Sequence, residues 1–107
     1  MIEADGEPRD FAARLEQWHS DSHGIWHFIP VPAPVAEALD GTALMRRLES
    51  GRRSGFGSVK LTIRIGSSTW RTSAFPMRSS WAIPVSAKVR KAEAIAAGDL
   101  LNVTLIF

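Results

Sequence analysis

The sequence predicts a small, mainly β domain, a barrel or sandwich of five or six strands with two short helices. Several short stretches alternate between apolar and polar residues, as a strand with one buried face requires. Two of these stretches flank a two-residue turn that contains glycine, a pattern typical of a β-hairpin. Helical spacing of apolar residues is confined to two stretches, so helices are expected to play a minor part.

Length and composition indicate one globular domain. The chain has 107 residues, of which 45% are hydrophobic and 22% charged. We expect a flexible N-terminus over residues 1–9 and a single domain over residues 10–107. The absence of cysteine excludes disulfides and thiolate metal sites. We expect a cytoplasmic protein, because the sequence shows neither the pattern of a signal peptide nor an apolar run that could span a membrane.

The first two elements are expected to be strands. Residues 10–18 alternate so that Phe11, Ala13 and Leu15 can face a core, although a helix remains an alternative for this stretch. Residues 25–32, IWHFIPVP, are apolar on both faces. Two prolines within this segment predict that it lies at a sheet edge, or leaves the sheet, at that end.

A helical section and then a hairpin are expected in the middle of the chain. Residues 34–50 carry helical spacing, and Gly41 is expected to divide them into two short pieces. A turn at Gly66–Ser67 would pair Ile65 with Ser68 and Ile63 with Trp70. This register places the apolar residues of both strands on one face, namely Val59, Leu61, Ile63, Ile65, Trp70 and Ala74.

The C-terminal part predicts a short strand, a basic helix and a closing strand. Residues 81–85 form the short strand, and Ser86 is a candidate N-cap for a helix over 87–95. Gly98 suits the left-handed position that ends a helix, and Asp99 is expected to hold the turn that follows. The closing strand would direct four residues into the core: Leu101, Val103, Leu105 and Phe107.

Three stretches resemble a bacterial family of unknown function, domain-of-unknown-function family 1905. They are WRTSAFP at 70–76, WAIPVSAKVRKAEAIAAGDLLNVTLIF at 81–107, and IWHFIPVP at 25–32. The resemblance covers roughly residues 10–107 and includes no catalytic signature. It implies a double-split β-barrel, the fold of AbrB-like transcription factors, which grip DNA with basic residues across a dimer. The chain differs from the family pattern at residues 36–55, where a short loop is expected.

Charge is distributed unevenly along the chain. Residues 1–50 hold nine acids and four bases, whereas residues 51–107 hold two acids and nine bases. Such asymmetry can mark a nucleic-acid-binding region, but pairing between strands of the two halves would also account for it. The candidate residues for nucleic-acid binding are Arg78, Lys88, Arg90 and Lys91.

Aromatic residues suggest a second kind of site. The chain has four tryptophans and no tyrosine. We expect Trp70 and Trp81 to pack in the core. Trp26, Phe28 and Phe75 are less easily buried together, so they could line a ligand groove or a self-association patch. The alternative is that they form a second small core under the middle helix.

Metal binding and catalysis find little support in the sequence. His19, His23 and His27 recur at every fourth residue, but Gly24 interrupts them and a turn followed by a strand would separate the rings. We therefore expect no metal site and no cofactor. The sequence predicts a non-enzymatic binding or interaction module, either a monomer or a homodimer. The alternatives are weak nucleic-acid binding and small-molecule binding through an aromatic groove.

Overall fold

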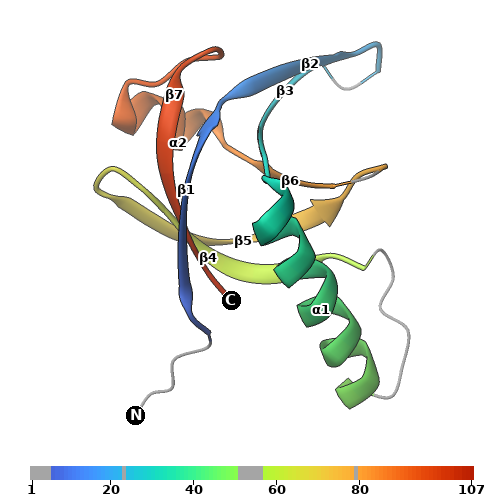
Figure 1. Cartoon of the computed structure of the whole chain (residues 1–107). Coiled ribbons are helices and arrows are strands. Elements are labelled where there is room, and N and C mark those ends of the chain that lie inside the picture. The colour runs from blue at the N-terminus through green and yellow to red at the C-terminus, as the bar shows by residue number, and fades with distance from the viewer. Residues whose placement is uncertain (1–5, 23, 51–56, 79) are drawn as a thin grey trace.

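A computed structural model describes residues 6–22, 24–50, 57–78 and 80–107 of the chain. One antiparallel sheet of seven strands, in the order β1-β7-β4-β5-β6-β3-β2, curls into a half-barrel (Figure 1). Its strands are β1 (Pro8–Arg14), β2 (Glu16–Ser20), β3 (Gly24–Pro30), β4 (Val59–Ile65), β5 (Ser68–Pro76), β6 (Trp81–Pro84) and β7 (Leu100–Ile106). Two helices accompany the sheet, α1 (Ala33–Ser50) and α2 (Ala87–Glu93). The mainly β class is confirmed, but the expected five or six strands were too few.

The additional strand arises at Leu15. The stretch expected to form one strand over 10–18 is divided there into β1 and β2, which lie at opposite ends of the sheet order. The Leu15 N–H donates to the Asp99 carbonyl at 2.9 Å, and the Leu15 carbonyl accepts from the Gly98 N–H at 2.7 Å. Its side chain is only 1% exposed, which confirms its predicted place in the core. β1 then pairs with β7, and β2 pairs with β3.

The hairpin β4–β5 has the predicted register. Ile65 pairs with Ser68 and Ile63 with Trp70, and the four apolar residues of β4 are buried. The closing strand β7 pairs with both β4 and β1. Its Val103 and Leu105 side chains enter the same core, where they are 1% and 0% exposed. These aliphatic side chains exclude water from the interior of the half-barrel, which is the main favourable contribution to folding.

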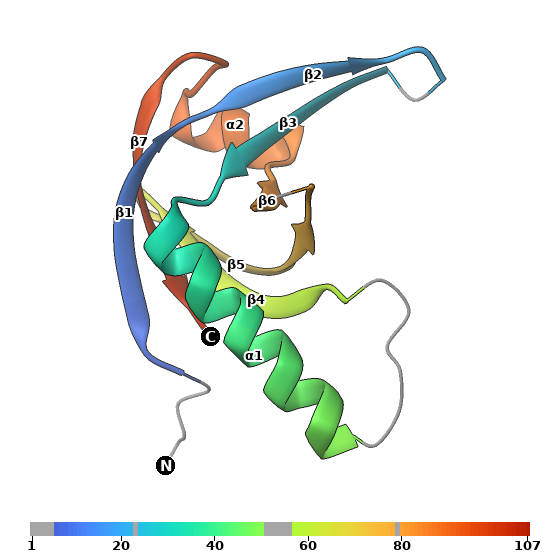
Figure 2. The same cartoon turned by 45° about the vertical axis from the view of Figure 1, so that its right-hand side comes forward.

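The first helix is longer than predicted. Gly41 lies inside a continuous helix of 18 residues, so the expected division into two short pieces was wrong. An exposed glycine in a helix costs about 1 kcal/mol relative to alanine, and burial of Val35 and Leu39 against the sheet outweighs this cost. The second half of α1 projects beyond the sheet (Figure 2) and leaves Leu48 67% exposed.

The second helix begins as predicted but ends earlier. The Ser86 side chain accepts from the Val89 N–H at 3.3 Å, which confirms the N-cap. The left-handed residue at the C-terminus is Ala94, with φ of 55°, whereas Gly98 adopts φ of 96° in the following turn. The prediction that Gly98 ends the helix was therefore wrong. Asp99 does hold this turn, because its carboxylate accepts from the Ala96 N–H at 2.9 Å.

Candidate functional site

An apolar groove of about 430 Å³ opens on the outer face of the sheet. Strands β2, β3 and β6 and the end of β5 contribute its walls. Four of its seven lining residues are aromatic, and no lining residue is charged. The lining consists of Trp18, Trp26, Phe28, Phe75, Met77, Ala82 and Pro84.

Strand pairing brings these residues together from distant parts of the sequence. Trp18 lies opposite Trp26 in the β2–β3 pair. Phe28 lies opposite Pro84 in the β3–β6 pair, and Phe75 lies opposite Ala82 in the β5–β6 pair. Because paired residues point to the same face of a sheet, all of them project away from the core.

The inner face of the same strands is also apolar. Ile29 and Ile83, which alternate with the groove residues along β3 and β6, are both fully buried. Pro30 pairs with Ala82 of β6, while the pairing of β3 with β2 ends at Phe28. Proline is thus accommodated where β3 has one paired neighbour, in agreement with the sequence-based expectation.

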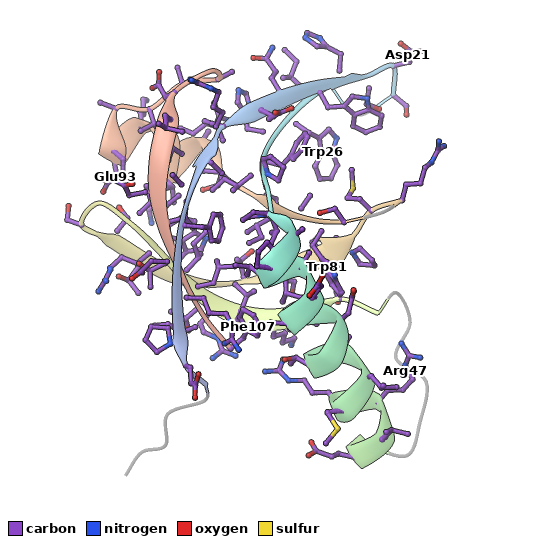
Figure 3. The ribbon with its side chains drawn as sticks, viewed as in Figure 1. Asp21, Trp26, Arg47, Trp81, Glu93 and Phe107 are labelled. Carbon is purple, nitrogen blue, oxygen red and sulfur yellow. The ribbon has the colours of Figure 1, made fainter. Side chains whose placement is uncertain are left out.

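The candidate ligand residues Trp26, Phe28 and Phe75 lie in this one groove. Trp26 is 46% exposed and Phe75 41% exposed, so neither belongs to a closed second core. No residue of α1 lines the groove, although the alternative had placed these aromatic residues under that helix. Figure 3 shows the contrast with Trp81, which lies beside α1 and donates from Nε1 to Asp40 at 2.8 Å.

The four candidate residues for nucleic-acid binding lie in two places. Lys88 and Lys91 are exposed on α2, and Arg90 is half-buried on the same helix. Arg78 is exposed in the loop between β5 and β6. That loop lies on the opposite side of the molecule from α2 in Figure 1.

A second cavity, of about 400 Å³, lies between β3, β5 and the start of α2. Its polar side chains are those of His27, Thr72, Ser86 and Arg90. The Nδ1 atom of His27 is shielded from solvent and has no hydrogen-bond partner among the described residues. Burial, and secondarily the charge of Arg90, lower the pKa of the His27 imidazole below its ordinary value of 6.5.

The histidines do not form a metal centre within the described part of the chain. His19 lies on β2, where its ring contacts the Gln17 side-chain amide at 3.1 Å, while His27 lies on β3. His23 lies outside the described residues. Residues 6–22, 24–50, 57–78 and 80–107 contain no cluster of three His, Cys, Asp or Glu side chains that could hold a metal ion.

Sequence reasoning missed several residues of both cavities. It did not assign Trp18, Met77, Ala82 or Pro84 to the groove, and it considered His27 only as a metal ligand. One signal was present, because residues 25–32 and 81–85 are apolar at both odd and even positions. Strands of this kind bury one apolar face in the core, and their second apolar face must be covered by something else or remain exposed.

Comparisons with known proteins identify a family but no activity. No curated protein matches the chain at a significant level. Neither helix in the described ranges has the length and apolar composition needed to cross a membrane. A family model described as "Domain of unknown function (DUF1905)" matches residues 11–105, which include every strand except the first residues of β1 and the last of β7. The chain therefore belongs to the DUF1905 family.

Proposed function

We propose that this protein is a non-enzymatic binding module whose aromatic groove takes a small, uncharged, mainly apolar molecule. The observation that carries the proposal is the groove of about 430 Å³, with four aromatic side chains and no charged one in its lining. Ligand sites are concave, mostly apolar and about 300–1,000 Å³ in volume, so this groove has the expected size and chemistry.

Exposure of the aromatic residues supports the same conclusion. Trp18, Trp26 and Phe75 are 60%, 46% and 41% exposed, so each retains apolar surface that folding has not removed from water. A ligand that covers this surface gains roughly 25 cal/mol for every Å² of apolar area removed from water. Flat indole and phenyl rings favour a planar ligand, because offset stacking adds to the gain from burial.

Nucleic-acid binding receives less support from the geometry. Phosphate recognition depends on several cations placed along one surface. Lys88 and Lys91 are exposed together on α2, but Arg90 is half-buried and Arg78 belongs to a separate loop. Weak nucleic-acid binding stays a prediction that a mobility shift with duplex DNA at low salt would test.

The proposal can be tested with the uncharged fluorescent probe N-phenyl-1-naphthylamine. We expect saturable binding with enhanced probe fluorescence in the wild-type protein. Trp26→Thr and Phe75→Thr should each weaken binding by about tenfold, because each removes a large apolar wall from the groove. Threonine is chosen because it is well tolerated in β-strands.

Leu48→Thr serves as the matched control, since Leu48 is 67% exposed on α1, outside the groove. It should leave the probe affinity unchanged. Equal loss of affinity in the control, or fluorescence that rises without saturation, would contradict the proposal. Sedimentation equilibrium tests the alternative occupant: a dimer that Phe75→Thr dissociates would make the groove a self-association surface instead.

We further propose that the half-barrel is the double-split barrel of AbrB-like proteins. Two features support this: β5 pairs with β4 over Ser68–Ala74 and with β6 over Phe75–Pro76, and the chain crosses the sheet at Leu15. An experimental structure superposed on an AbrB-like barrel tests it, and a mismatch in strand order would reject it.

A further inference from the structure

The cavity beside α2 adjoins the aromatic groove and shares Trp26 and Pro84 with it, but its polar lining gives it a different chemistry. His27 follows Trp26 along β3 and therefore points to the opposite face. An imidazole, a guanidinium and two hydroxyl groups line the cavity together with five apolar or aromatic residues, Ile25, Trp26, Trp70, Pro84 and Val85, and no described acidic residue lines it. These lining groups are thus suited to a ligand other than the one proposed for the groove.

The His27 ring offers an unused donor. The Nδ1 atom is shielded and unpartnered, and leaving a buried N–H without an acceptor is costly, so the proton is assigned to Nε2. Among the described residues, His27 Nδ1 is the sole shielded side-chain nitrogen or oxygen without a hydrogen-bond partner. Nε2 is not shielded in this way, so it is the ring nitrogen that solvent reaches. The His27 carbonyl accepts from the Val85 N–H at 2.9 Å and fixes the residue beside α2.

Arg90 is the cation of the cavity, and its terminal nitrogens are available. Its Nε donates to the Val85 carbonyl over a long 3.4 Å. It forms no ion pair with any described acidic residue. The nearest acid along α2, Glu93, accepts instead from the hydroxyls of Ser67 and Ser68, at 3.4 and 2.5 Å. A half-buried guanidinium without a counter-charge favours an anion in the adjacent space.

We propose that this cavity binds an oxyanion, a carboxylate or a phosphate group, between Arg90 and His27. Arg90 would hold two oxygens through its terminal N–H groups, and His27 would donate from Nε2. The Ser86 oxygen already accepts from the Val89 N–H, so its hydroxyl hydrogen is left to donate to the anion. Thr72 supplies a further hydroxyl on the β5 side of the cavity. The proposal does not depend on what the aromatic groove binds.

The test is an NMR titration of the whole chain with inorganic phosphate, and separately with acetate, against sodium chloride at equal ionic strength. We expect saturable shifts of the Arg90 Nε–H and His27 ring signals with at least one oxyanion and none with chloride. Arg90→Gln should weaken binding by about tenfold or more, because a charge-assisted bidentate contact is lost. The response to each anion shows whether the site takes carboxylate, phosphate or both.

Lys88→Gln is the matched control, because it removes a charge from the same helix outside this cavity. It should leave the affinity unchanged. His27→Leu, which removes the ring donor, is the second variant if Arg90→Gln does not fold by circular dichroism, and it should also weaken binding. Absence of saturable shifts, equal shifts with chloride, or equal loss in Lys88→Gln would overturn the proposal.

Discussion

Two regions of the sheet use apolar residues differently. In the β4–β5 hairpin, buried residues such as Leu61 and Ile63 alternate with outward-facing polar ones such as Thr62 and Arg64. In β3 and β6, buried Ile29 and Ile83 alternate instead with outward-facing Phe28 and Ala82. The hairpin therefore has one apolar face, whereas β3 and β6 have two.

This difference distinguishes the side chains that the core requires from those that it does not require. Burial of one face against the common core is enough to account for a strand's place in the sheet. The outer faces of β2 and β3 and the end of β5 carry aromatic side chains that the core does not require, and these side chains line the groove together with Ala82 and Pro84 of β6. A contiguous apolar surface of this kind supports the binding proposed for the groove.

The largest effect is expected in the core below the hairpin. Ile63→Ala should lower the free energy of unfolding by about 3 kcal/mol, because a fully buried side chain is replaced by a cavity. Urea denaturation followed by circular dichroism measures the change. Leu48→Ala, at a side chain that is 67% exposed, should change it by less than about 0.5 kcal/mol. Similar losses in the two variants would contradict the assignment of the core.

The hairpin could be predicted because its information is local. The turn at Gly66–Ser67 and the alternation of both strands specify the same register, so pairing errors would expose Ile63 and its neighbours. The Ser86 N-cap is equally local, because the side chain and the N–H that it binds are three residues apart.

The remaining features depend on contacts between distant residues. Helix α1 continues through Gly41 because its first half packs against the core. This packing outweighs the low helix propensity of glycine. The crossing at Leu15 requires hydrogen bonds to residues 98 and 99. The groove requires the pairing of Phe75 with Ala82 and of Phe28 with Pro84. Alternation along each strand identifies residues that the core does not require, but it does not show that these residues meet.

A smaller effect is expected at the two hairpin turns. Gly66→Ala should lower the free energy of unfolding by about 1–2 kcal/mol, because alanine is strained at φ of 60° and its methyl group would contact the Glu93 carboxylate. Gly24→Ala in the β2–β3 turn adds a methyl group at φ of 81°, into open space, and so reports backbone strain alone. Equal losses in the two variants would show that Glu93 does not hold α2 against the β4–β5 turn.

Removing an aromatic side chain from the groove should cost less than removing one from the core. Trp18→Thr should lower the free energy of unfolding by about 1 kcal/mol or less, because the side chain is 60% exposed and threonine favours strands. Urea denaturation is again the measurement. A loss as large as that of Ile63→Ala would mean that the outer face is needed for folding, and the distinction between the two regions would fail.

The smallest expected effect is a pH dependence of the free energy of unfolding, which arises from His27 on the inner face beside α2. Burial and Arg90 lower the pKa of His27 in the folded protein below 6.5, so the unfolded chain takes up a proton first as the pH falls. The stabilising contribution of neutral His27 is therefore complete above pH 6.5 and declines below it. Arg90 is the one charged residue among the described residues that line the cavity with His27, and no carboxylate in this lining raises the pKa of the imidazole.

In His27→Gln this part of the pH dependence should disappear, while His19→Gln, at an exposed position on β2, should retain it. Urea denaturation between pH 5 and 7, in a buffer free of phosphate and carboxylate, compares the slopes, and an unchanged slope in His27→Gln would refute the assignment.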